Sequence, residues 1–169
     1  YKLQSFFFMP VFGINNATIS IAAYNYGARK PHRITDTLKY ACSIAMAIMV
    51  TGLLVFQFAP DMLLDMFNAS GEFLRIGERA LRIISWHFPI AAIGIALGAS
   101  FQALGNGTYS AITSLCRQLF ALLPVAYLLS LTGEVVNVWW AFPIAEVISL
   151  IVTLILYNRI YRQKIKPMM

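Results

Sequence analysis

The sequence predicts an all-α protein, a polytopic bundle of about five transmembrane helices, and three observations support this. Only 12% of the 169 residues are charged and 59% are hydrophobic, whereas about a quarter of the residues of a soluble protein are charged. The charged residues are clustered, which leaves long stretches with none. These stretches are continuously apolar and lack the alternation of membrane β-strands. In hydrocarbon such a stretch can satisfy its backbone hydrogen bonds only as a helix.

The uncharged stretches give the number and the approximate positions of the spans. Three of them contain no Asp, Glu, Lys or Arg at all, and two more follow, of which the last is interrupted only by Glu146. A hydrocarbon core of roughly 30 Å needs about 20 helical residues, and each stretch can provide such a span. We therefore predict one transmembrane domain over 1–169, with spans at about 4–26, 38–60, 80–104, 108–131 and 137–158.

The basic residues predict the orientation of the chain. Four follow the first apolar stretch and four follow the last: Arg29, Lys30, Arg33 and Lys39, then Arg159, Arg162, Lys164 and Lys166. Basic residues mark cytoplasmic loops, and both clusters lie on the same side because four predicted spans separate them. We expect a multi-pass protein of the plasma or inner membrane with a cytoplasmic C-terminus. The positive charge then contacts membrane lipid and not nucleic acid.

The longest connection, 61–79, carries both acidic and apolar residues. We expect it to lie outside and to form a short interfacial helix, broken near 68–71, that leads into the third span. Asn68-Ala69-Ser70 matches the glycosylation acceptor pattern, which is a frequent chance match.

Polar residues inside the predicted spans are the candidate functional residues. Asn15 and Asn16 lie in the first span and Gln102 in the third. Because amides are costly to expose to lipid, they face protein or a water-filled cavity. Two interpretations remain open: hydrogen bonding that joins helices, or the polar wall of a substrate pathway.

Glu146 is the only carboxylate inside a predicted span. An apolar environment favours the protonated carboxyl, so Glu146 can carry a proton or balance a cation. It can equally be a structural partner of Arg117, which with Gln118 lies in the fourth span. Arg117 can also extend toward the inner interface. His87 is a weaker candidate, either a hydrogen-bonded structural residue or a proton relay.

Other site chemistry is not predicted. Cys42 and Cys116 have no metal-ligand spacing, and we expect no metal site and no cofactor beyond a coupling ion. No predicted span contains an aspartate, and His87 has no nucleophile at helical spacing, so we expect no enzyme. Because the chain begins at Tyr1 and not at Met, we also expect it to be a piece of a longer protein.

Several of these residues together resemble a known family. Pro10-Val11-Phe12-Gly13, then Tyr24-Asn25-Tyr26-Gly27-Ala28-Arg29-Lys30 and Arg33, look like the second helix of a lobe in multidrug and toxic compound extrusion (MATE) transporters. The segments 101–105 and 139–146, with Arg117 and Pro124, look similar to later helices of the lobe. The resemblance covers nearly the whole chain.

The resemblance implies two six-helix lobes that export cationic, amphipathic compounds in exchange for Na⁺ or H⁺. This chain would supply helices eight to twelve, and its partner would be the missing N-terminal lobe. Most motif positions would be architectural: Pro10, Gly13, Asn25, Gly27, Ala28, Gly105 and Arg117. One feature departs from the pattern. Some Na⁺-coupled members have an acidic residue in the tenth helix, and the span 80–104 has none.

Two other functions fit the same sequence. A lipid-linked polysaccharide flippase of the same superfamily should hold its pyrophosphate with several cationic side chains, and only Arg117 lies deep in a span here. A structural membrane subunit without transport activity would not explain the polar residues inside the spans.

Overall fold

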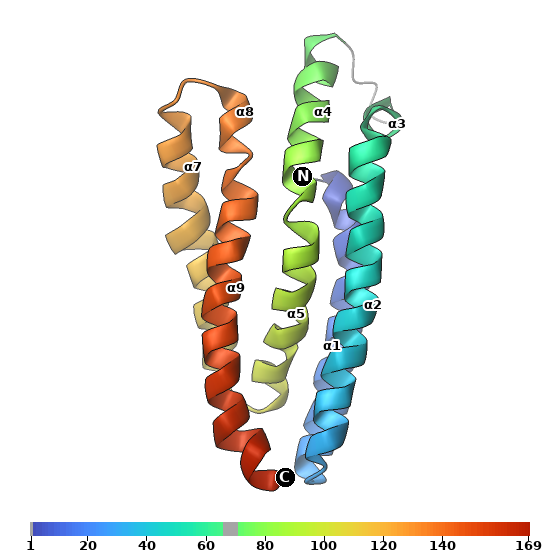
Figure 1. Cartoon of the computed structure of the whole chain (residues 1–169), viewed down its shortest axis with the longest axis vertical. Coiled ribbons are helices and arrows are strands. Elements are labelled where there is room, and N and C mark those ends of the chain that lie inside the picture. Colours follow the sequence, from blue (N-terminus) through green and yellow to red (C-terminus); the bar gives the residue numbers. More distant parts are fainter. Residues whose placement is uncertain (1, 66–70) are drawn as a thin grey trace.

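The computed structural model describes residues 2–65 and 71–169, and every element within these ranges is helical (Figure 1). The long N-terminal helices are α1 (Lys2–Gly27) and α2 (Pro31–Phe58), followed by the short α3 (Pro60–Asp65). The middle of the chain forms α4 (Glu72–Ser85), α5 (Phe88–Ala103) and α6 (Gly107–Leu115). The remainder forms the π-helical η1 (Cys116–Leu122), α7 (Leu123–Ser130), α8 (Val135–Val138), α9 (Ala141–Ile160), η2 (Tyr161–Ile165) and the 3₁₀ turn η3 (Lys166–Met168).

The predicted all-α fold with about five spans is confirmed. Four helical stretches are long and apolar enough to cross a membrane: Lys2–Gly27, Pro31–Phe58, Gly107–Ser130 and Val135–Met168. The fifth span is the pair Leu74–Ser85 and Phe88–Ala103, bent by 45° at its break. Pro89 lies directly after the break, where its missing N–H is tolerated in a first helical turn.

The helices extend beyond the predicted spans in two places. The second helix begins at Pro31, not at 38, because a proline suits a helix start and the basic turn that follows is also helical. The last helical stretch continues past 158 to Met168. In the 61–79 connection, α3 is a short helix and Glu72–Ser85 leads into the third span. The glycosylation pattern at 68–70 lies outside the described residues.

The long helices stand roughly side by side in one layered bundle (Figure 1). Helices α1 and α2 pack against each other, α5 packs against both, and α9 packs against α5 and η1. The loop after α1 and the C-terminal end lie together at one end of the bundle. Helix α5 is therefore the central element that joins the two sides of the bundle.

Two apolar clusters stabilise opposite halves of the bundle. The first contains a group of packed aromatic rings: Phe88 lies 5.1 Å from Phe56 and 5.6 Å from Phe8, measured between ring centroids. The second lies near the basic end and joins α1, α2, α5 and the C-terminal turns through Ala22, Ile34, Leu38, Phe101, Leu104, Ile160 and Ile165.

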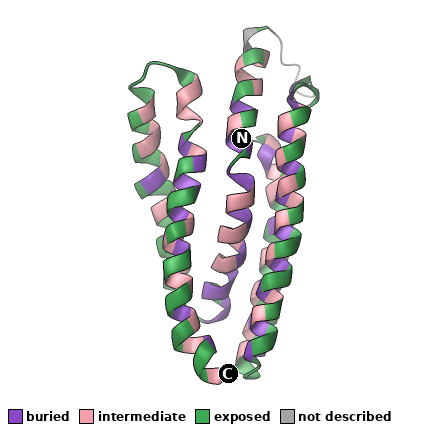
Figure 2. Cartoon of the chain, in the orientation of Figure 1, coloured by how far each residue is buried: buried purple, intermediate pink, exposed green. Residues whose placement is uncertain are grey.

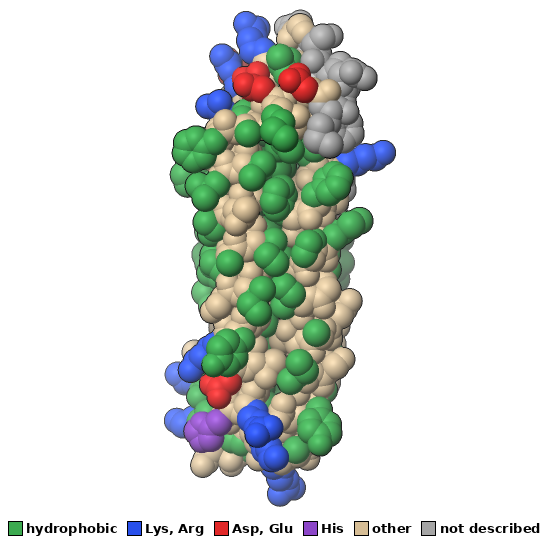
Figure 3. Space-filling model, turned by 90° about the vertical axis from the view of Figure 1, so that its right-hand side faces the viewer, with side chains coloured by type: hydrophobic (Ala, Val, Ile, Leu, Met, Phe, Trp, Pro, Cys, Tyr) green, Lys and Arg blue, Asp and Glu red, His purple; other side chains and the backbone are tan. Residues whose placement is uncertain are grey.

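The outer surface is apolar, the reverse of a soluble protein. Large exposed hydrophobic side chains include Phe58, Phe120, Tyr127, Leu128 and Ile155, each more than 60% accessible. Figure 2 shows exposed residues along the outward faces of the long helices, and Figure 3 shows hydrophobic side chains over the middle of one face, with charges gathered at its two ends. Such a surface belongs in a bilayer, and the protein is a multi-pass membrane protein.

Candidate functional site

An ion pair lies inside the bundle, between the fourth and fifth spans. The Nη1 atom of Arg117, on η1, is 3.7 Å from the Oε1 atom of Glu146, on α9. The side chain of Glu146 is 9% exposed and that of Arg117 is 36% exposed. Of the alternatives open from the sequence, the structure contains the pair. Removing one partner of a buried pair leaves an uncompensated charge, so the two side chains must be considered together.

The helix that carries Arg117 has an unusual local geometry. Helices α6, η1 and α7 follow one another without a break, and η1 is π-helical. Pro124 follows this segment by two residues and has no N–H to donate to the carbonyl of Phe120. A wide π turn accommodates such a missing bond, and π turns are frequent at functional sites. Proline therefore gives a physical reason for the wide turn at Arg117.

Small residues let Glu146 approach the centre of the bundle. Ala141, Pro143 and Ala145 are buried on the same part of α9, and Gly94 on α5 faces the carboxylate. A Cβ atom at Gly94 would lie 3.7 Å from Oε1 of Glu146, an ordinary contact distance. The carboxylate thus packs directly over the α5 backbone.

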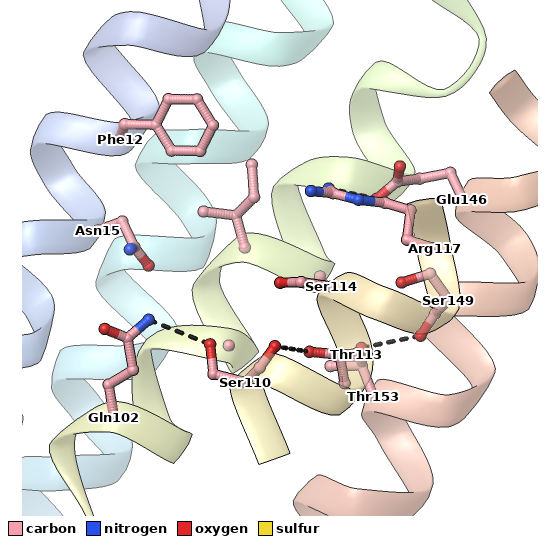
Figure 4. A pocket seen from close by; sticks show the side chains of 13 residues that line it. Phe12, Asn15, Gln102, Ser110, Thr113, Ser114, Arg117, Glu146, Ser149 and Thr153 are labelled. Carbon is pink, nitrogen blue, oxygen red and sulfur yellow. Dashed lines mark hydrogen bonds and ion pairs between the residues drawn. The ribbon is translucent and has the colours of Figure 1, made fainter. Parts of the chain in front are cut away.

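A small polar cavity of about 120 Å³ extends from the ion pair toward the basic end of the bundle (Figure 4). Gln102 Nε2 donates a hydrogen bond to Ser110 Oγ at 3.2 Å, and Thr153 Oγ1 donates to the carbonyl of Ser149 at 2.8 Å. The Oδ1 atom of Asn15 is buried and has no hydrogen-bond partner. The polar lining is formed by Asn15, Gln102, Ser110, Thr113, Ser114, Arg117, Glu146, Ser149 and Thr153.

A larger cavity of about 400 Å³ contacts the same ion pair. Its walls are aromatic: the His87 ring stacks on Phe8 at 5.7 Å and lies 6.1 Å from the Phe142 ring, between centroids. Among its other lining residues are Gln4, Ser5, Phe12, Gln118, Leu122 and Ala145. The Oε1 atom of Gln4 is also buried without a partner. Arg117, Glu146 and Phe12 line both cavities and form the boundary between them.

The structure brings most of the sequence candidates together. Asn15, Gln102, Arg117 and Glu146 line the smaller cavity, and Gln118 lines the larger one. Asn16 is exposed and lines neither, because consecutive helical residues point about 100° apart.

The hydroxyl side chains of the smaller cavity were not predicted. Their spacing was nevertheless a signal: Ser110, Thr113, Ser114 and Arg117 fall on one face of a helix, and so do Glu146, Ser149 and Thr153. Isolated serines and threonines are common in spans, where they bond to their own backbone. Only their alignment with a charged residue distinguishes these positions. Among the described residues, no cluster of His, Cys, Asp and Glu could hold a metal ion.

Known proteins with similar sequences are multidrug resistance proteins. The chain is 22% identical over 165 residues to the probable multidrug resistance protein YoeA of Bacillus subtilis, covering 96% of this chain and 36% of that protein. It is 26% identical over 130 residues to the probable multidrug resistance protein NorM of Thermotoga maritima, covering 76% of this chain and 28% of that protein. The chain thus spans about a third of the length of these relatives.

Solved structures of the same kind share the fold. The structure of the MATE multidrug transporter DinF-BH matches with a TM-score of 0.85 and 31% identity, covering 98% of this chain and 36% of that one. An inward-facing MATE family transporter of the MOP superfamily matches with a TM-score of 0.87 and 21% identity, over 99% of this chain and 38% of that one. The family model MatE matches residues 1–128, and the chain belongs to this family of multidrug transporters.

Proposed function

We propose that the complete protein is a secondary active exporter that exchanges cationic, amphipathic compounds for protons. The chain supplies most of its C-terminal lobe, in the cell membrane, with the basic end on the cytoplasmic side. The observation that carries the proposal is the Arg117–Glu146 pair at the boundary of an aromatic cavity and a polar one.

The aromatic cavity suits the substrate class. Phe8, Phe12 and Phe142 present apolar rings, and Glu146 adds a carboxylate. Aromatic faces attract cations, and a mostly apolar cavity with a few polar groups is typical of small-molecule sites. A flat, hydrophobic cation has the positive charge and the apolar surface that such a cavity binds. The substrate side of the proposal therefore follows from the lining.

The surroundings of Glu146 favour a proton over Na⁺ as the coupling ion. The guanidinium of Arg117 lies 3.7 Å from the carboxylate and occupies the place where further oxygen ligands of a metal ion would have to lie. A proton binds to the carboxylate oxygen itself and needs no set of ligands. Na⁺ would have to displace the arginine first, whereas protonation merely releases it.

The polar cavity gives the proton a route from the carboxylate toward the cytoplasmic side. Its hydroxyl and amide groups line a space of about 120 Å³, large enough for water, and the unpartnered Asn15 Oδ1 is a group that a buried water would satisfy. Water in this cavity would link Glu146 to the basic end of the bundle. Drug and proton then occupy one carboxylate in turn, and this competition is the basis of antiport.

Transport by this mechanism also needs the second lobe. Alternating access requires one half of a transporter to rock against the other around a fixed site, and this chain covers about a third of its relatives. The complete protein, with its N-terminal lobe as partner, is therefore the unit to test.

The proposal predicts proton-driven dye transport in proteoliposomes. With the complete protein reconstituted, an imposed pH difference should drive accumulation of a fluorescent cationic dye, and an equal Na⁺ gradient at constant pH should not. An anionic dye of similar size is the substrate control. Transport driven by Na⁺ alone would refute proton coupling, and no dye transport with either gradient would refute the exporter.

The wide turn at Arg117 gives a second prediction. Pro124→Ala restores an N–H, so that the segment 116–122 can close into ordinary α-helix and turn Arg117 away from Glu146. We expect dye export to fall severalfold while the protein remains folded. Leu123→Ala, at an exposed neighbouring position, is the control. Full activity in the Pro124 variant would show that the wide turn is not needed.

A flippase for pyrophosphate-linked lipids is less compatible with these cavities. Among the described residues, Arg117 is the only Lys or Arg that lines either of the two cavities around the ion pair, and Glu146 already pairs with it. A diphosphate requires several uncompensated cations.

A further inference from the structure

The basic end of the bundle contains a third cavity, of about 700 Å³, that has no part in the proposed transport site. It lies where the end of α1 meets the C-terminal turns η2 and η3. Its lining combines cations with apolar and aromatic groups: Tyr26, Gly27, Arg29, Gln163, Lys164, Pro167 and Met168.

Lys164 is fixed at this cavity by contacts to two other helices. Its Nζ atom donates a hydrogen bond to the carbonyl of Leu104, at the end of α5. The same atom lies 5.7 Å from the centre of the Tyr26 ring, on α1. A lysine held in this way has already lost much of its side-chain freedom, so it can bind a further group at a lower entropic cost.

Arg29 lies in a backbone conformation that L-residues with side chains rarely adopt. Its φ is +53°, because it ends α1 in a Schellman turn: Arg29 N–H donates to the carbonyl of Tyr26, and Lys30 N–H to that of Asn25. Glycine is the usual residue at this position, and any other costs stability. An arginine at this strained position is explained if its side chain binds a ligand, since strained backbone conformations are frequent at functional sites.

The positive charge around the cavity is not neutralised by the protein. Eight basic residues lie at this end: Arg29, Lys30, Arg33, Lys39, Arg159, Arg162, Lys164 and Lys166. Asp36 is the only carboxylate near them in sequence. In the part of the chain that the structure describes, the one ion pair is Arg117–Glu146, deep in the bundle. The cluster thus has the charge of an anion site that lacks its anion.

We propose that this cavity binds a phosphate-bearing anion, held between Arg29 and Lys164. Arginine and lysine are the usual phosphate ligands, and basic clusters at the ends of membrane spans bind anionic lipid headgroups. Tyr26, Pro167 and Met168 give the cavity an apolar wall that suits the first carbons of a lipid's acyl chains. A bound anion would cross-link α1 to the C-terminal turns and so stabilise the bundle.

The test is the thermal unfolding midpoint of the complete protein in detergent. Phosphatidylglycerol, phosphatidylcholine and inorganic phosphate are added in separate series. Ligand that binds only the folded state should raise the midpoint by about 5 °C when its concentration is about a hundred times its Kd. A rise with phosphatidylglycerol alone identifies a lipid headgroup, and a rise with inorganic phosphate identifies a soluble anion. Both support the site, and equal responses to phosphatidylcholine and phosphatidylglycerol overturn it.

Arg29→Gly separates ligand binding from folding. It relieves the positive-φ strain, so the midpoint without ligand should stay the same or rise, while the response to the anion falls by at least half. Lys164→Gln should also lose the response. Arg75→Gln removes one exposed positive charge from the opposite end of the bundle, and this variant should keep the full response to the anion. A full response in Arg29→Gly would overturn the proposal even if Lys164→Gln unfolded.

Discussion

Glu146→Gln in the complete protein is expected to reduce proton-driven export of a cationic dye by about tenfold, within the usual range of coupling free energies between two ligands. Glutamine keeps the size of the side chain and its contact over Gly94. It cannot release a proton or attract a cation, so both halves of the exchange fail together. Initial rates of dye transport in proteoliposomes under a fixed pH difference give the measurement.

Two comparisons make the result specific to Glu146. Glu134→Gln changes an exposed carboxylate in the turn before α8 and should leave transport unchanged. Arg117→Gln leaves Glu146 buried without its partner. The double variant Arg117→Gln/Glu146→Gln should transport dye no more slowly than the slower of the two single variants, because the effects of paired residues are not additive. Undiminished export by Glu146→Gln, with normal yield, would remove this carboxylate from the mechanism.

Gly52→Ala is expected to destabilise the aromatic half of the bundle by about 1–3 kcal/mol, as overpacking of a core does. The added Cβ atom would lie 2.8 Å from Cγ of Phe7 and 3.1 Å from Cδ2 of Phe88. Phe7 cannot withdraw easily, because its ring lies 5.8 Å from that of Phe56 and 6.3 Å from that of Phe88. The midpoint of thermal unfolding in detergent measures the loss.

A second helical glycine is the matched control for this change. Gly98, on α5, has no atom within 4 Å of an added Cβ, and alanine there gains helix propensity of up to about 1 kcal/mol. We expect Gly98→Ala to unfold at the same temperature or higher. Equal midpoints for the two variants would mean that the packing around Gly52 has room to adjust.

The spans could be predicted because charge is costly in hydrocarbon, and its absence is visible in the sequence. The bend in the third span could not be placed in this way. Its first part, Leu74–Ser85, contains Arg75, Glu78, Arg79 and Arg82, so hydropathy placed the start of the span only at 80. The packing of α4 against α2 shows that the helix before the break continues the span.

The candidate site could be predicted only in part, because a sequence gives residue types but not helix rotation. Asn15 and Asn16 are equivalent as amides, yet one lines a cavity and the other does not. The Arg117–Glu146 contact joins residues far apart in sequence and depends on how α9 packs against η1. The two cavities depend on the same packing, so no local pattern could reveal them.

In the exchange proposed above, the single carboxylate at the boundary also determines which driving force would act. Glu146 carries one negative charge, which one proton or one monovalent cation can neutralise, and Arg117 keeps its charge throughout. An exchange of one for the other moves no net charge across the bilayer. Membrane voltage, worth about 2.3 kcal/mol per charge per 100 mV, therefore adds nothing to this exchange, which follows the pH difference alone and would continue in a depolarised cell.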